Sequence, residues 1–186
     1  MQTLLDLIKG RVSTPKLGMP VPSAEQVNEA LACARRSPDH GRLRPWRFFV
    51  LQGDDLAKLG GIYEQAARRQ NPALEEAAAE RLRGLPLRAP MLIVVASHVV
   101  VGHKVPVWEQ LVATGCAAQN LQLALHAMGY GCMWRTGEMA ADPTVKAAFG
   151  LAEVDQIVGY LYVGTALEQP KPAPADDEEV VFWGMP

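Results

Sequence analysis

The chain has 186 residues, of which 49% are hydrophobic and 20% are charged, a balance that indicates an ordinary globular protein and excludes a disordered one. Its formal net charge of −2 argues against general nucleic-acid binding, which needs a basic excess to neutralise phosphates. The longest apolar run, residues 90–96, has the length of a strand rather than of a membrane span. The first nine residues place Asp6 inside an apolar stretch and lack a signal-peptide layout, so we expect a cytoplasmic protein.

The first half of the chain predicts helices around one strong strand. Ser23 is followed three residues later by Gln26, which is the capping-box pattern that begins a helix. Residues 46–52 are densely apolar, which indicates a strand covered on both faces. The helices predicted in this half span residues 3–10, 24–36, 54–67 (capped by Asp54) and 72–83, the last as an exposed flank or lid.

The second half predicts three more strands and the longest helix. This helix spans residues 107–128 and carries few charges after Glu109, so we expect it to be buried on most sides. The other predicted elements are strands at 89–97, 131–134 and 156–164 and a helix at 143–149. Helices flanking a small sheet make a three-layer α+β domain. We expect one domain over residues 1–186, with an extension from residue 166 whose apolar end, residues 180–183, reaches a partner subunit.

Neither the cysteines nor any familiar catalytic motif points to a reaction. Cys33, Cys116 and Cys132 form no CxxC pair and have no metal-ligand spacing, so we expect no metal site. We interpret the three as small buried apolar residues, while a cysteine nucleophile with a neighbouring base stays open. The chain has no GxSxG and no HExxH motif, which argues against a hydrolase.

Four segments, in order along the chain, resemble the nitroreductase family of FMN-dependent NAD(P)H oxidoreductases, and its compact members most closely. The segments are residues 11–13, residues 37–50, residues 103–110, and residues 129–137 together with 159–164. The resemblance implies a three-layer α-β-α nitroreductase-like domain with a central, mostly antiparallel sheet. It also implies a homodimer with FMN sites at its interface, one small-molecule electron acceptor, and neither nucleic acid nor membrane as a partner.

The resemblance implies FMN contacts from three stretches of the chain. They are Arg11, Val12 and Ser13, then Trp134, Arg135 and Thr136, and, across the dimer interface, Arg36 and His40. An arginine fork and a hydroxyl suit a phosphate group. Three other readings stay open: Arg11 as a cation at a helix C-terminus, Trp134 as a core aromatic residue, and His40 as an exposed or structurally paired side chain.

The segment after Arg36 departs from the family pattern and changes what the ring contacts can be. Val12 stands at the second position of the family's arginine pair, and Asp39, Arg42 and Arg44 stand where small or amide residues are usual. The extra arginines indicate an anion site, or stabilisation of an anionic reduced flavin.

The resemblance also assigns the electron donor and the substrate side. NADH or NADPH would meet the end of the long helix, namely Ala124, Leu125, His126, Ala127, Met128 and Gly129, although Leu125 and Met128 read equally well as core residues. Lys104 and Trp108 are substrate-side candidates. The other reading of Lys104 is a solvated surface pair with Glu109.

The implied activity is hydride transfer from NAD(P)H through FMN to a nitroaromatic or quinone-like acceptor, in ping-pong order. No catalytic side chain is expected, because the flavin carries the chemistry. Two alternatives stay open: a flavin carrier or redox sensor with little turnover, and a helical interaction module without flavin that uses residues 54–84.

Overall fold

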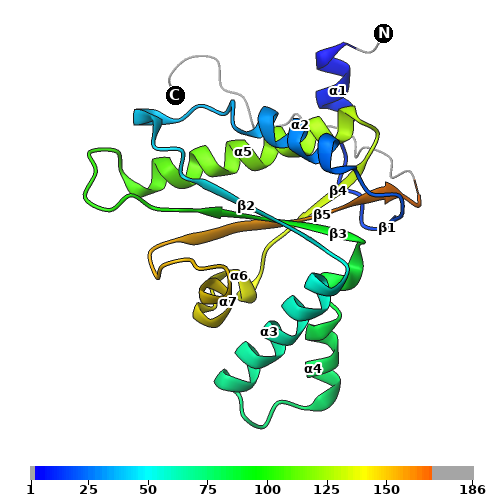
Figure 1. Cartoon of the computed structure of the whole chain (residues 1–186), viewed down its shortest axis with the longest axis vertical. Helices are drawn as coiled ribbons and strands as arrows, with labels where there is room; N and C mark the ends of the chain where they lie inside the picture. Colours follow the sequence, from blue (N-terminus) through cyan, green and yellow to red (C-terminus); the bar gives the residue numbers. More distant parts are fainter. Residues whose placement is uncertain (1–2, 169–186) are drawn as a thin grey trace, which may run out of the picture.

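The structure is a computed structural model, and it describes residues 3–168. A twisted sheet separates two layers of helices (Figure 1). The strands are β1 (Leu17–Gly18), β2 (Trp46–Gln52), β3 (Met91–Ser97), β4 (Gly131–Arg135) and β5 (Gln156–Ala166). Their order is β1-β5-β3-β2, with β4 also paired to β5, and all these pairs are antiparallel. The predicted tail contact at residues 180–183 lies outside the described residues.

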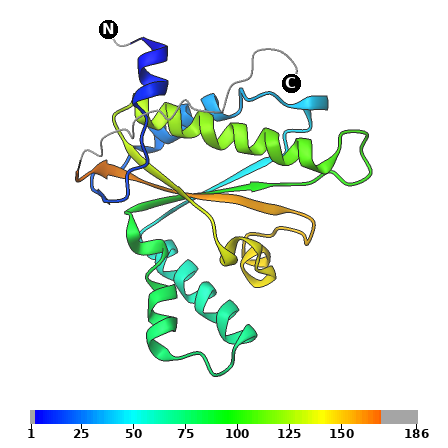
Figure 2. The same ribbon diagram turned by 180° about the vertical axis from the view of Figure 1, so that it is seen from behind.

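The helices divide between the two faces of the sheet, as seen from both sides in Figures 1 and 2. One layer holds α1 (Leu4–Gly10), α2 (Ala24–Ala34) and α5 (Val107–Ala127), which we call the α5 face. The other holds α3 (Asp54–Gln70), α4 (Glu76–Arg83), α6 (Glu138–Ala141) and α7 (Pro143–Ala148), which we call the α3 face. Two short 3-10 turns, η1 (His40–Arg42) and η2 (Pro86–Arg88), precede β2 and β3. The predicted three-layer α+β architecture with a mostly antiparallel sheet is confirmed.

Strand β3 forms the centre of both cores. All of its residues are buried, which explains its uninterrupted apolar sequence. Met91, Ile93 and Val95 pack on the α5 face. Leu92 and Val94 pack on the α3 face. None of the helices within residues 3–168 is both long enough and apolar enough to cross a bilayer.

Local sequence signals set most element boundaries. The capping box at α2 is confirmed: Ser23 Oγ accepts from the Gln26 N–H at 3.3 Å, and Gln26 Oε1 accepts from the Ser23 N–H at 2.9 Å. Gly53, not Asp54, occupies the N-cap of α3. The helix expected from residue 72 begins at Glu76, because the backbone turns first, with the Leu74 N–H donating to the Asn71 carbonyl.

Three expectations about burial were wrong in part. Strand β2 does pack on both faces, with Phe48 against one core and Phe49 against the other. Its cover is incomplete, because Arg47 and Val50 on it are exposed. Helix α5 is buried along one side, but Trp108 near its start is 63% exposed. Of the three cysteines only Cys132 is buried, whereas Cys33 is exposed and Cys116 is half-buried.

Two neighbouring glycines of α3 should respond oppositely to alanine. A Cβ atom at Gly60 would overlap the carbonyl oxygen of Arg83 at the end of α4, whereas one at Gly61 would meet nothing within 4 Å. We expect Gly60→Ala to destabilise the protein by about 1–3 kcal/mol through overpacking. Gly61→Ala should stabilise it by up to about 1 kcal/mol, through helix propensity. Urea unfolding measures both; equal free energies for the two variants would contradict the close contact of α3 with α4.

Candidate active site

The first predicted segment lies against the start of β4. The Thr14 N–H donates to the Cys132 carbonyl at 3.0 Å, and Ser13 and Cys132 form an isolated parallel β-bridge. Arg11 and Val12 therefore border a hollow of about 290 Å³, which we call the Arg11 hollow. Its other lining residues include Gln122, His126, Gly129, Tyr130 and Cys132.

The charge at this hollow comes from Arg11. The Arg11 side chain is half-buried, and within residues 3–168 it forms no ion pair with a carboxylate. Burial raises the pKa of the Cys132 thiol to about 12, and the nearby Arg11 charge lowers it only in part. Cys132 is therefore a neutral thiol at physiological pH. This argues against Cys132 as a catalytic nucleophile, since the thiolate is the nucleophilic form.

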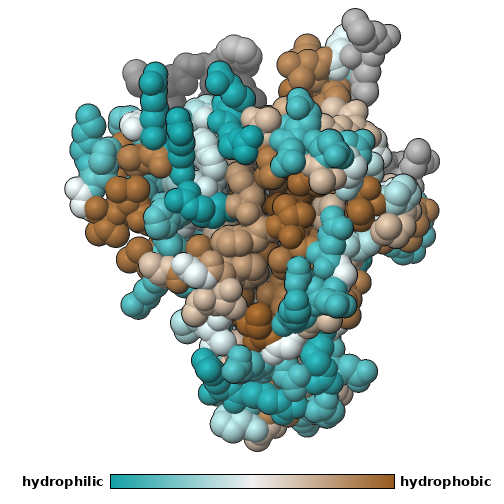
Figure 3. Space-filling model, viewed as in Figure 1, coloured by the Kyte–Doolittle hydropathy of each residue, from teal (hydrophilic) through white to brown (hydrophobic). Residues whose placement is uncertain are grey.

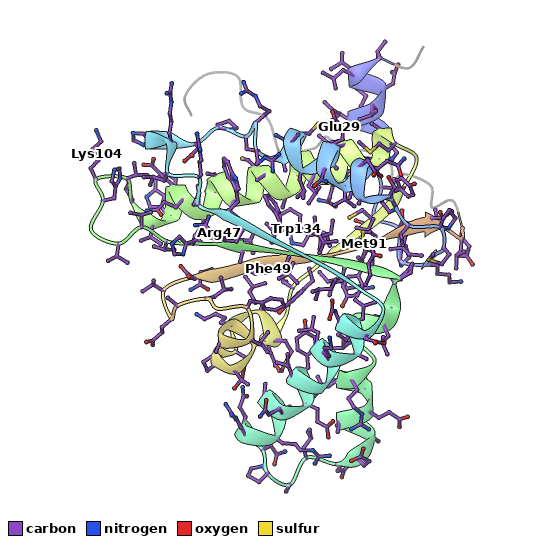
Figure 4. All side chains as sticks on the ribbon, viewed as in Figure 1. Glu29, Arg47, Phe49, Met91, Lys104 and Trp134 are labelled. Carbon is purple, nitrogen blue, oxygen red and sulfur yellow. The ribbon has the colours of Figure 1, made fainter. Side chains whose placement is uncertain are left out.

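The second predicted segment lies at the opposite end of β4. Trp134 Nε1 donates to the Val158 carbonyl at 3.2 Å. Its indole ring lies across Gly159, where a Cβ atom would be 2.6 Å from Cδ1 of the ring. Trp134 is half-buried and packs against the core on the α5 face, on the α5 side of the crossing strands in Figure 4. It is thus a core aromatic residue that also borders an open site.

Arg135 points to the other face of the sheet from Trp134. It pairs with Tyr160 in register, and Tyr160 belongs to the α3-face core. Arg135 and Thr136 border a hollow of about 570 Å³ together with Arg88, Tyr160 and Tyr162. Burial raises the pKa of Tyr162, which Arg88 and Arg135 lower in part, so its hydroxyl stays neutral and donates to the Leu85 carbonyl at 3.0 Å.

Arg11 and Arg135 are therefore not brought together within one subunit. They border different hollows at opposite ends of β4. Successive side chains of a strand alternate between faces, and β4 spans roughly 13 Å at about 3.3 Å per residue. Within one subunit the two predicted segments therefore line separate hollows.

Three more predicted residues, His40, Arg36 and Lys104, lie at three other places. His40 Nδ1 lies 2.6 Å from Glu109 Oε2, so Glu109 pairs with His40 rather than with Lys104. Arg36 borders a third hollow, between α2 and β2. Figure 4 shows Lys104 at the outer end of the loop before α5, well away from Trp134.

The stretch expected to meet NAD(P)H forms the end of α5 and its turn. Leu125 is fully buried and belongs to the core, and Ala124 and Met128 pack against that core. Ala127 is exposed. Only His126 and Gly129 of this stretch line the Arg11 hollow. Their position makes this hollow the meeting point of two predicted segments that are far apart in the sequence.

Sequence reasoning missed the residues that complete these sites. Gln122 in the Arg11 hollow carried no motif, and Tyr130 there lay in a family segment but was given no role. Arg88, which borders the hollow beside Arg135, lies in a turn. Gly159 carried a usable signal, because a glycine inside a strand pattern often marks a close approach.

The donor set fits a phosphate-bearing aromatic cofactor such as FMN. Arg11 and Arg135 are half-buried guanidinium groups, and neither forms an ion pair within the described part of the chain. A partly desolvated guanidinium is satisfied by an anionic acceptor. Trp134, next to Arg135 on β4, supplies an apolar aromatic surface.

Comparison with known proteins decides the family. The model of the nitroreductase family matches residues 8–165. The chain belongs to the nitroreductase family. This family member is 39% identical over 161 residues to the candidate NAD(P)H nitroreductase YdjA of Escherichia coli strain K12, covering 87% of each chain. The resemblance seen in the sequence, and with it the assignment as an oxidoreductase, is confirmed.

Solved structures agree with the nitroreductase assignment. The nitroreductase-like family protein of Bacillus cereus matches with a TM-score of 0.81 at 25% identity, covering 94% of this chain and 91% of that one. A candidate nitroreductase of Desulfovibrio desulfuricans, solved in complex with FMN, matches with a TM-score of 0.72 at 20% identity, covering 97% and 96%.

Proposed function

We propose that the protein is an FMN-dependent oxidoreductase that passes a hydride from NAD(P)H to nitroaromatic or quinone-like acceptors in ping-pong order. The observation that carries this proposal is the pair of half-buried arginines at the two ends of β4, neither of which pairs with a carboxylate within residues 3–168, in a chain of this family. FMN, when bound, supplies the hydride chemistry. A relative solved with FMN and relatives named for NAD(P)H support the same cofactors.

In this proposal each segment of the chain has one task. Arg11 and Ser13 hold the phosphate, since a guanidinium fork and a hydroxyl match its oxygens. Trp134, Arg135 and Thr136 hold the far end of the elongated cofactor. His126 and Gly129, which line the Arg11 hollow, contact NAD(P)H. No protein acid or base is required.

We propose further that the sites are completed in a homodimer, with Arg36 and His40 reaching the FMN of the other subunit. The apolar residues Leu4, Leu5 and Ile8 of α1 and Trp108 and Val112 of α5 are all exposed in the single chain. Figure 3 shows α1 as a brown projection at the top and a brown band down the middle of the face that β2 crosses. Exposed apolar patches of this kind are typical of a subunit interface.

The absorbance spectrum of the purified protein tests the activity. We expect a yellow protein that NADH or NADPH bleaches within the mixing time and that a quinone or nitroaromatic acceptor recolours. A yellow protein that neither donor bleaches would favour the carrier or sensor alternative. A colourless protein that refuses added FMN would contradict the flavin proposal and favour the interaction module.

Sedimentation of the same preparation at several concentrations tests the assembly. The expected species has twice the chain mass of 20.2 kDa, and dilution should release flavin as the dimer dissociates. A monomer that keeps its FMN would contradict the shared site and leave the flavoenzyme proposal standing.

A further inference from the structure

The segment between α2 and β2 gathers guanidinium groups around one hollow. Arg35, Arg36, Arg42 and Arg44 border a space of about 690 Å³ that also contacts Asp39 and Trp46. All four arginines are exposed, and Figure 4 shows nitrogen-tipped side chains extending outward from this segment. We call this space the arginine hollow. The chain as a whole is slightly acidic at −2, so the positive charge is a local feature.

Within the described residues, no ion pair compensates the charge of the arginine hollow. Within residues 3–168, no carboxylate oxygen lies within 4.0 Å of these four guanidinium groups. Asp39, the carboxylate among the described residues that border the hollow, accepts instead from the backbone N–H of Arg44 at 2.7 Å. Clustered like charges repel one another, and a bound anion relieves that repulsion with charge-assisted hydrogen bonds.

The backbone holds this arrangement in an unfavourable conformation. Arg42 and Arg44 have φ angles of 54° and 49°, in the left-handed region that residues with a Cβ atom avoid. Arg47 braces the loop by donating to the Arg44 carbonyl at 3.2 Å and to the Trp46 carbonyl at 2.9 Å. Backbone strain of this kind persists where the surrounding structure enforces it, and it concentrates at functional sites. Trp46, only 8% exposed, forms the apolar floor.

We propose that the arginine hollow binds the phosphate or carboxylate group of an anionic substrate of the flavin reaction, with Arg42 and Arg44 as its specificity-determining residues. This inference rests on the proposed function: if Arg36 and His40 reach the FMN of the other subunit, an anion held beside Arg36 lies next to that FMN. Two sources carry this chemistry, the 2′-phosphate of NADPH and an acid group on the electron acceptor.

The test compares two pairs of substrates that differ by one anionic group. NADPH is compared with NADH using a neutral quinone, and 4-nitrobenzoate is compared with 4-nitrobenzamide using NADH. In the double variant Arg42→Gln/Arg44→Gln, we expect the ratio of kcat/KM for the anionic over the neutral member of one pair to fall by about tenfold or more. A fall for NADPH identifies the donor phosphate as the ligand, and a fall for nitrobenzoate identifies the acceptor.

Calorimetry gives a readout that does not depend on turnover. Adenosine 2′,5′-bisphosphate is titrated against adenosine 5′-monophosphate, and benzoate against benzamide, into the holo protein. The anion preference found in the natural protein should shrink in the double variant by the same factor. The control variant Lys58→Gln/Arg69→Gln removes two positive charges from exposed positions of α3, across the sheet, and should leave both preferences in place.

The outcomes separate this inference from the function on which it rests. Failure of NADH to reduce the bound flavin, in a protein that also fails with NADPH, contradicts the proposed function. Flavin reduction with selectivity ratios and anion binding that are the same in the natural protein and the Arg42→Gln/Arg44→Gln variant contradicts the arginine hollow alone.

Discussion

Replacing Arg11 with alanine is expected to weaken FMN binding by about ten- to hundredfold. A charge-assisted hydrogen bond contributes about 1.5–3 kcal/mol, and each 1.4 kcal/mol corresponds to about a factor of ten. Arg11 is half-buried beside the Arg11 hollow, and within the described chain it has no competing carboxylate. Arg11→Lys should recover only part of the affinity, because an ammonium cannot make the bidentate contact of a guanidinium.

Flavin content after dialysis and fluorescence titration with FMN measure this effect. Arg135→Ala, at the other end of β4, should also weaken binding, and the double variant should lose more than either single one. Arg69→Ala removes an exposed arginine from α3 and serves as the control. If Arg11→Ala and Arg135→Ala both kept the flavin occupancy of the natural protein, the assignment of these two arginines to FMN binding would be refuted.

Gly159→Ala should disturb Trp134 and the cofactor together. The new methyl group would overlap Nε1 of the indole and lie 2.6 Å from Cδ1 and 2.8 Å from Cε2. The ring must move off β5 and give up its hydrogen bond to the Val158 carbonyl. Overpacking of this kind costs about 1–3 kcal/mol of the free energy of unfolding. FMN affinity should fall as well, because Trp134 forms the wall of the proposed site.

A double-mutant cycle separates this contact from a general loss of stability. In a Trp134→Ala background the indole ring is absent, so the methyl group added by Gly159→Ala meets no clash. The added change should then lower the free energy of unfolding only slightly. The two changes should therefore be strongly non-additive in urea unfolding and in FMN titration. Additive effects would show that Gly159 acts on the protein independently of Trp134.

The elements of this fold were predictable because their signals are local. A capping box marks the residue at which α2 begins, and the unbroken apolar run of β3 indicates that both faces of the strand are buried. The errors have a common cause. The dense apolar sequence of β2 predicted cover on both faces, and Phe48 and Phe49 do pack against the two cores. Its place at the end of the strand order and the exposure of Val50 are properties of the assembled sheet.

The same distinction between local sequence signals and tertiary structure applies to the candidate site. The family segments were visible in the sequence, and the match over residues 8–165 confirms the family that they indicated. Which of their side chains share a hollow was not visible. Leu125 and His126 are adjacent in the chain, yet one is fully buried and the other lines the Arg11 hollow, because neighbouring helix positions point about 100° apart.

By itself the sequence determined the family, the succession of helices and strands, and the residue types available to a phosphate and an aromatic ring, since each depends on residues close together in the chain. Only the tertiary structure decided that Arg11 and Arg135 lie at opposite ends of β4. It also decided that His40 pairs with Glu109, and that Trp134 rests on Gly159. These contacts join segments far apart in sequence, and strand alternation, sheet order and the crossing of α5 over the sheet fix their geometry.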